Sequence, residues 1–179
     1  MKQRHRQAGY SLYELLITLS LAAIILGLGI PSFGRLVADK RLLVESNALF
    51  HAVHRARQES VVRRRVVSIC PSVDSLYCDP DGDWSRGWIV FANKGWNGQG
   101  VRDDGEALIS HHRVSKTVRI KANRAVFSFR STHLRATNGT LIVCDQDSRA
   151  ETRAVIISYT GRPRVARKNT RGKAYRCAD

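Results

Sequence analysis

The sequence changes from basic to apolar at Gly9-Tyr10-Ser11-Leu12-Tyr13-Glu14-Leu15-Leu16-Ile17. The nine residues before Tyr10 carry three cations and no acidic side chain, and the stretch from Leu12 to Ile30 is almost unbroken aliphatic. A helix of that length spans roughly the 30 Å hydrocarbon core of a bilayer, at about 1.5 Å per residue. Because basic flanks stay in the cytoplasm, we expect the rest of the chain to lie outside it.

One carboxylate, Glu14, interrupts the apolar stretch. A charge inside a membrane segment costs about 2.5–3.5 kcal/mol at a helix centre and less near an end, so Glu14 indicates a function. The alternative is an ordinary secretory signal, which is cut after its apolar stretch at small residues such as Gly27, Gly29 and Ser32. Glu14 argues against that alternative.

The stretch from Gly9 to Ile17 resembles the type III signal of type IV pilins and pseudopilins. The resemblance implies that a prepilin peptidase cuts after Gly9 and N-methylates Tyr10, where the family usually has Phe. It also implies that Glu14 neutralises the N-terminal amine of a neighbouring subunit during filament assembly. Pro31 falls where pilins commonly bend their long helix, and proline interrupts helical hydrogen bonding.

The sequence divides into a leader (1–9), a transmembrane and assembly segment (10–30), the rest of a long helix (31–65), a β head (66–160) and a basic tail (161–179). The spacing of apolar residues after Ser32 predicts that the helix continues to about Arg65, with one stripe packed on the sheet of the head. The stripe comprises Leu36, Leu43, Leu49, Phe50, Val53 and Ala56.

Short β-branched runs broken by Gly, Asn, Asp and Pro follow Arg65, a pattern typical of an antiparallel β domain. The predicted strands are Val66–Cys70, Gly87–Ala92, Ala107–His111, Thr117–Lys121, Ala125–Phe129, Thr140–Cys144 and Arg153–Tyr159. Trp84 and Trp88 are interpreted as core residues. A cluster of oxygen-bearing side chains lacks the spacing of a calcium loop and is interpreted as turn residues. It comprises Asn93, Asn97, Asp103, Asp104 and Glu106.

The segment from Cys70 to Phe91, with Trp84-Ser85-Arg86-Gly87-Trp88, and the following Gly100–Glu106 resemble the GspH/FimT class of minor pilins and pseudopilins. The resemblance covers most of the chain. It implies an α+β, type IV pilin-like fold, in which a long N-terminal helix is followed by a two-sheet antiparallel β head.

The four cysteines, Cys70, Cys78, Cys144 and Cys177, form an even set with no Cys-x-x-Cys pair. In an exported chain an even set predicts disulfides, and four cysteines allow three connectivities. We favour Cys70–Cys78 as a small surface loop and Cys144–Cys177 as a clamp on the tail. A zinc site or a nucleophilic cysteine is the alternative, but it requires tighter ligand spacing or a partnered base.

The chain is strongly basic, with 30 Lys and Arg against 15 Asp and Glu, a net charge of +15. Such a field attracts polyanions: nucleic acid, acidic lipid headgroups or acidic polysaccharide. No acidic residue separates Glu106 from Asp145 or Glu151 from Asp179. Within the second interval, the tail from Gly161 to Cys177 holds seven cations that the sequence leaves without a local counter-ion. Five of them are arginines, whose planar guanidinium suits phosphate.

Gly161-Arg162-Pro163-Arg164 resembles the Gly-Arg-x-Arg motif of FimT proteins that bind DNA for natural transformation. The resemblance implies that Arg162 and Arg164 are the primary DNA contacts. The cations that follow in the tail are expected helpers: Arg167, Lys168, Arg171 and Lys173.

These patterns predict a minor pilin that binds extracellular double-stranded DNA for uptake during natural transformation. Its other expected partners are pilins and minor pilins, the prepilin peptidase and the inner membrane. The protein is expected to cross that membrane once, with its head in the periplasm, before joining a pilus at the cell surface. No catalytic constellation is recognised, and neither catalysis nor a cofactor is expected. The alternatives are a GspH-like pseudopilin of a type II secretion system and a pilus assembly or adhesion factor without DNA binding.

Overall fold

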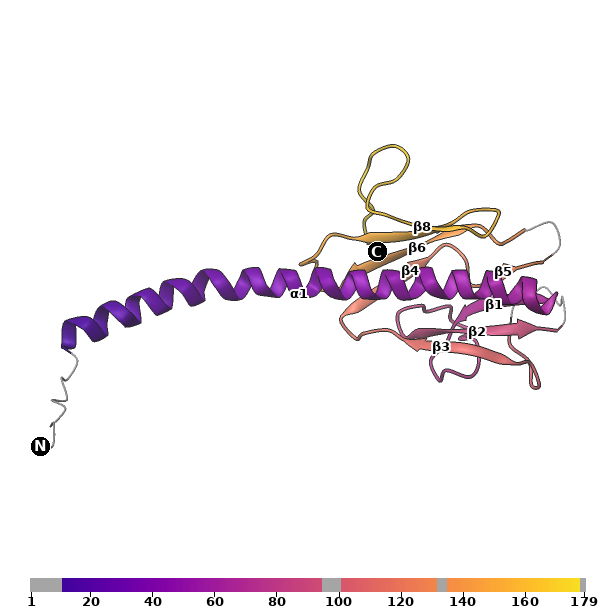
Figure 1. Cartoon of the computed structure of the whole chain (residues 1–179), viewed down its shortest axis with the longest axis horizontal. Helices are drawn as coiled ribbons and strands as arrows, with labels where there is room; N and C mark the ends of the chain where they lie inside the picture. The colour runs from indigo at the N-terminus through magenta and orange to yellow at the C-terminus, as the bar shows by residue number, and fades with distance from the viewer. Residues whose placement is uncertain (1–10, 95–100, 132–134, 178–179) are drawn as a thin grey trace, which may run out of the picture. The chain divides into compact units, whose positions relative to one another are not determined.

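A computed structural model describes residues 11–94, 101–131 and 135–177 (Figure 1). The chain divides into two compact units, Met1–Val37 and Ala38–Asp179, and helix α1 (Leu12–Arg63) contributes to both. The second unit is the head.

In the first unit, helix α1 begins at a serine cap. The Ser11 hydroxyl accepts a hydrogen bond from the Glu14 backbone N–H at 3.2 Å, and Leu15 N–H donates to the Ser11 carbonyl. Ser-x-x-Glu at a helix start is a capping-box sequence, and a carboxylate there also suits the positive end of the helix dipole. Helix α1 is long enough, and apolar enough over a window of mean hydropathy 2.2, to cross a membrane.

In the head, helix α1 buries one stripe against the sheets. Leu49, Val53 and Ala56 are buried, as predicted, but Leu42 is fully buried where the sequence analysis named Leu43, which is half-buried. Leu36 was also assigned to this stripe and is exposed; it belongs to the first unit. Helical spacing alone identified the stripe but misplaced it by one residue at its start.

The helix ends in a tight C-cap. Arg64 adopts a left-handed conformation with φ 51°, and Arg65 N–H donates to the Ser60 carbonyl at 3.3 Å. This is the Schellman arrangement, in which glycine usually takes the left-handed position because other residues lose about 1–2 kcal/mol there. The turn directs the chain straight into the first strand.

Two four-stranded antiparallel sheets follow (Figure 1). The first has the order β3-β2-β1-β5, from β1 (Val66–Pro71), β2 (Gly87–Asn93), β3 (Leu108–Arg113) and β5 (Phe127–Phe129). The second has the order β4-β6-β7-β8, from β4 (Val118–Ala122), β6 (Gly139–Asp145), β7 (Arg153–Ile157) and β8 (Pro163–Ala166). The predicted α+β architecture is therefore confirmed, but strand β8 was not predicted.

The core lies between α1 and the two sheets. Trp84 and Trp88 are each 2% exposed, which confirms their interpretation as core residues. The indole N–H of Trp84 donates to the Arg124 carbonyl at 3.2 Å, so its polar atom is satisfied. Phe127 and Phe129 of β5 complete the aromatic layer.

Two polar contacts fix α1 to the sheets. The side chain of Glu45, a residue only 5% exposed, accepts from Ser115 N–H at 3.0 Å and lies 2.8 Å from Nε2 of His112. Asp39 accepts from the buried guanidinium of Arg153 at 2.8 Å, and this bond holds the pKa of the Asp39 carboxyl below its usual value. Both contacts set the helix in one register on the sheets.

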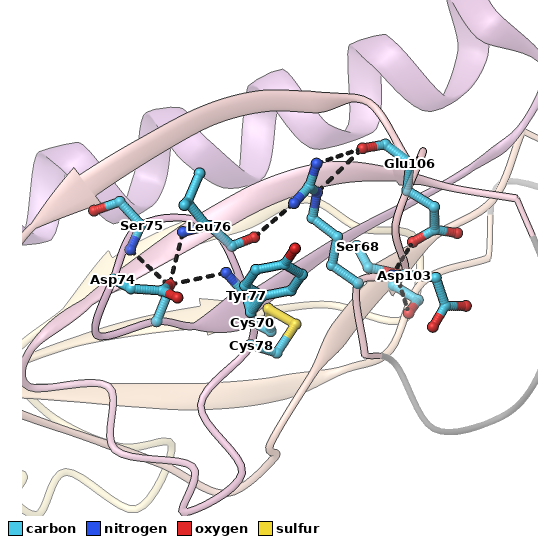
Figure 2. Close-up of a disulfide and its surroundings, with 12 residues drawn as sticks. Ser68, Cys70, Asp74, Ser75, Leu76, Tyr77, Cys78, Asp103 and Glu106 are labelled. Atoms are coloured by element: carbon cyan, nitrogen blue, oxygen red, sulfur yellow. Dashed lines mark hydrogen bonds between the residues drawn. A yellow bond between two sulfur atoms is a disulfide. The ribbon is translucent and has the colours of Figure 1, made fainter.

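The Cys70–Cys78 disulfide closes a small loop whose Cα atoms are 5.5 Å apart (Figure 2). Inside the loop Asp74 accepts from the backbone N–H groups of Tyr77 and Leu76 at 2.9 and 2.8 Å. These bonds, the one from Tyr77 foremost, lower the pKa of Asp74. The loop is thus a compact turn held by its own backbone.

The acidic cluster beside this loop also makes turn contacts (Figure 2). The buried Glu106 carboxylate accepts from the N–H groups of Lys94 and Asp103, and the Tyr77 hydroxyl donates to Asp104 at 2.7 Å. Within the described residues no group of three acidic, histidine or cysteine side chains could hold a metal ion. Asn97, assigned to the same cluster, lies outside the described residues.

Candidate nucleic-acid interface

The predicted Gly-Arg-x-Arg segment forms the turn into β8 and the start of that strand. Gly161 N–H donates to the Ser158 carbonyl at 2.9 Å, and the Arg162 N–H donates to the Ser158 hydroxyl at 3.1 Å. Ser158 N–H in turn donates to the Arg162 carbonyl at 3.1 Å. A tight turn therefore fixes the backbone of Arg162 directly beside β7.

The glycine of this segment has two structural roles. Gly161 adopts φ +74°, a conformation that glycine takes without steric cost. A Cβ at this position would also lie 3.1 Å from Ala136 Cβ and 3.1 Å from a ring carbon of Phe129. Both the turn and the contact with the core therefore favour glycine immediately before Arg162.

Arg164 lies in β8, and Arg162 directly precedes that strand. Side chains two residues apart on a strand point to the same side. Val165, itself 39% exposed, pairs with the fully buried Val155, whereas Arg164 pairs with the half-buried Ile156, so Arg164 is on the face opposite to Val155. Both arginines are exposed. The strand therefore presents two guanidinium groups to solvent from a backbone paired to β7.

The chain after β8 folds back as a second hairpin, seen as the yellow loop in Figure 1. Lys168 and Ala174 form an antiparallel bridge, and Gly172 N–H donates to the Asn169 carbonyl at 3.0 Å. The Asn169 side chain accepts from the N–H groups of Arg171 and Lys173 at 2.9 and 3.0 Å. The tail is therefore an ordered hairpin with cations at its tip.

The two turns share one sequence pattern. Ser158-Tyr159-Thr160-Gly161-Arg162 and Asn169-Thr170-Arg171-Gly172-Lys173 each begin with a small polar residue and end with glycine followed by a cation. Both glycines have φ +74°. A type I turn followed by a left-handed glycine gives this geometry in hairpins. This local pattern is the sequence signal for both turns, neither of which was predicted.

A disulfide ties the end of the tail to the sheet. Cys144 in β6 and Cys177 are bonded with their Cα atoms 6.2 Å apart. Both pairings that we favoured are thus found, and no described cysteine is free. The bond closes the chain segment that carries the second hairpin, so the tail cations are presented from a closed loop.

The cations of the tail differ in their surroundings. Arg167 lies 2.9 Å from Glu151, so the inference that the tail has no local counter-ion is wrong for this residue. The two residues are 16 positions apart in the sequence, and the pairing of β7 with β8 brings them together. Lys168, Arg171 and Lys173 are exposed, and no ion pair is found for them within the described chain.

The processing and assembly residues are placed less completely. Gly9 and Tyr10 lie outside the described residues. Glu14 is exposed in the first turn of α1, where its backbone is held by the Ser11 cap. An exposed carboxylate on an apolar helix remains available to a cation from another chain.

Comparison with known proteins supports the fold. The family profile described as Type II transport protein GspH matches residues 45–161. The type IV minor pilin FimU of Pseudomonas aeruginosa aligns with a TM-score of 0.52 and 22% identity, over 71% of this chain and 89% of that one. The minor pseudopilin EpsH of the Vibrio cholerae type II secretion system aligns with a TM-score of 0.50 and 10% identity, over 70% and 96%. No curated protein sequence matches the chain.

Proposed function

Because the chain belongs to the GspH family of minor pilins and pseudopilins, we propose that it is a FimT-like minor pilin whose head binds double-stranded DNA. The binding segment is Gly161 to Arg164, and the biological role is uptake of extracellular DNA in natural transformation. The single observation that supports this most is the pair of exposed arginines at the start of β8, fixed by the turn at Ser158.

The chemistry of this pair suits phosphate. Each guanidinium donates from a planar fork that matches two phosphate oxygens, and it keeps its charge at every physiological pH. Contacts with the phosphate backbone release condensed counterions and carry little sequence information. Because β8 and the closed tail are already ordered, less conformational entropy is lost on binding than with a flexible basic arm.

The remaining tail cations add weaker contacts. Lys168, Arg171 and Lys173 extend the positive surface along the second hairpin, whereas Arg167 must exchange Glu151 for a phosphate. Affinity per head is expected to be modest. Several subunits on one duplex then raise it through effective concentration.

In this proposal the leader is cut after Gly9 and Tyr10 is methylated. Helix α1 anchors the chain in the inner membrane, and the head faces the periplasm before assembly into a pilus. Glu14 pairs with the N-terminal amine of a neighbouring subunit. The head acts by binding alone and catalyses no reaction. Mass spectrometry of the filament-incorporated protein tests the leader directly, because any residue before Tyr10 contradicts cleavage.

DNA binding is tested with the full chain in a non-ionic detergent and a fluorescent duplex. The parent is compared with Arg162→Gln/Arg164→Gln and with the charge-retaining Arg162→Lys/Arg164→Lys, over a salt titration. We expect log affinity to fall with log salt at a slope of about −0.9 per phosphate neutralised. The Gln pair should weaken binding strongly, and the Lys pair should retain part of it because charge remains but the planar fork is lost.

Each outcome decides between functions. If the parent does not bind at low salt, the proposal fails, and a pseudopilin whose basic face docks an acidic protein becomes the better interpretation. If the Gln pair binds as tightly as the parent while folding normally, DNA binding survives but the segment is wrong. Competition by an anionic polysaccharide at equal charge would instead favour an adhesion factor.

A further inference from the structure

The head carries a second cationic surface at the end where α1 stops. Arg64, Arg65, Asn93, Lys94 and Arg130 line a pocket of about 290 Å³. These residues come from the helix end, the end of β2 and the segment after β5, so they meet only in the folded head. We call the cations of this pocket, together with Arg135, the helix-end cluster.

The helix-end cluster carries more positive charge than the helix end alone requires. The C-terminus of a helix has about half a negative charge, which a nearby arginine can compensate. Four cations line this pocket, and no carboxylate is among its described lining residues. The Glu106 carboxylate accepts from the backbone N–H of Lys94 and is held in its own turn by the N–H of Asp103. Arg64, Arg65 and Lys94 of this pocket are exposed to solvent.

A buried polar atom in the same pocket also lacks a partner. Asn93 is 8% exposed, and its Oδ1 has no hydrogen-bond partner among the described residues. Asn93 lines the pocket beside the cations, so its amide is an unsatisfied polar group at this surface.

The helix-end cluster is continuous with the proposed DNA segment. Arg130 also lines a neighbouring pocket of about 270 Å³, together with Arg135 and Tyr159. The Arg135 guanidinium lies 5.7 Å from the centre of the Tyr159 ring. Tyr159 belongs to the turn that ends at Arg162, so the second pocket adjoins the segment that carries the proposed DNA contacts.

We infer that the helix-end cluster is a second phosphate-binding surface, which engages the backbone of the same DNA held by Arg162 and Arg164. This inference rests on the proposed function. A phosphodiester backbone is favoured over a single small anion because Arg130 lines both pockets, and Tyr159 of the second pocket belongs to the turn that leads to Arg162. Two separated contact regions on one head also orient the duplex, which a single pair of arginines cannot do.

The test compares two charge-matched double variants of the full chain in detergent. Arg65→Gln/Lys94→Gln removes two cations from the helix-end cluster. Arg113→Gln/Lys116→Gln removes two from the opposite end of the strands, where Arg113 pairs with Gly87 at the start of β2. We expect the first variant to make the log–log salt slope about 1.8 less steep, at about 0.9 per lost phosphate contact, and the control to leave it near the parent value.

A third variant separates charge from folding. Arg64→Gly relieves the left-handed strain at the helix end and removes one cation. It should melt at a higher temperature than the parent and yet bind DNA less tightly, with a slope about 0.9 less steep. Loss of folding cannot produce that combination.

The outcomes distinguish this inference from the function on which it rests. If the parent binds and Arg162→Gln/Arg164→Gln weakens it, but the helix-end variants keep the parent slope, only the second surface is refuted. If the control variant lowers the slope as much as the helix-end variant, the effect is general charge and the inference also fails. If the parent does not bind DNA, both are wrong.

Discussion

Replacing Gly161 with alanine is expected to destabilise the head by two separable effects. The first is conformational, since φ +74° is unfavourable for any residue with a Cβ and costs about 1–2 kcal/mol. Part of this, about 0.4–1 kcal/mol, is offset because alanine restricts the unfolded chain. The net conformational effect is therefore about 1 kcal/mol.

The second effect is steric. The new methyl group would meet Ala136 and a ring carbon of Phe129, both at 3.1 Å. Phe129 is 1% exposed and lies in the aromatic layer, so it has little room to move. Overpacking of a well-packed core costs about 1–3 kcal/mol. The two effects together predict a loss of about 2–4 kcal/mol.

Gly172 provides a matched control. It has the same φ of +74° in the same kind of turn, but nothing lies within 4 Å of its added Cβ. Gly172→Ala should therefore cost only the conformational part, about 1 kcal/mol. Chemical denaturation of both variants and the parent can be followed by fluorescence of the buried tryptophans. Equal losses for the two glycines would refute the steric half of the reasoning.

The Gly161 variant also tests how the arginines are positioned. If the turn must shift to relieve the contacts, Arg162 shifts with it. We expect DNA binding to weaken in Gly161→Ala under conditions where the protein is still folded, and to change less in Gly172→Ala. Unchanged binding by a folded Gly161→Ala protein would show that the turn does not position the contact.

Three further predictions follow from the contacts within the head. Glu45→Ala removes a buried acceptor of the Ser115 N–H and of a histidine ring, and should lower the free energy of unfolding in denaturant by about 2–4 kcal/mol. A loss below about 0.5 kcal/mol would contradict the role of Glu45 in fixing α1 to the sheet. The Asp39–Arg153 bond lowers the pKa of Asp39, so its contribution to the stability of the head is complete above the ordinary value of 3.8 and is lost as the pH falls through the lowered pKa. Asp39→Asn should flatten that part of the acid-unfolding curve, and an unchanged curve would contradict the prediction. Cys177→Ser opens a loop of 33 residues and should lower the free energy of unfolding by about 3–4 kcal/mol on the chain-entropy estimate, measured by thermal melting. It should also weaken DNA binding, and an unaltered affinity would mean that closure of the tail does not contribute to binding.

The regular elements were readable because their periodicity is local. The long apolar helix and seven of the eight strands follow from spacing within short windows. Strand β8 was missed because Arg162-Pro163-Arg164 has the composition of a tail. A strand at a sheet edge tolerates proline at its first position and charge on its open face, so composition did not reveal it.

Contacts between distant segments were beyond sequence reasoning. The burial of Glu45 depends on Ser115 and His112, which the sheet brings to the helix from about seventy positions away. The pairing of Arg167 with Glu151 arises from the β7–β8 hairpin. Arg130 and Arg135 lie in the acid-free interval between Glu106 and Asp145, but only folding brings Arg130 into one pocket with Arg64, Arg65 and Lys94. The cysteine pairs were tractable because one closes a short local loop.

Strand β8 leaves an open edge, and the family to which this chain belongs builds polymers. Strand edges with free backbone donors and acceptors invite pairing between molecules, which would compete with ordered assembly through the N-terminal helix. Pro163 removes one donor from β8, and like charges at Arg162 and Arg164 repel a second copy of the same strand. The arginines proposed to hold DNA therefore also disfavour edge-to-edge pairing of β8 between two heads. Neutralising Arg162 and Arg164 should lower the highest concentration at which the protein remains monodisperse, independently of the effect on DNA binding.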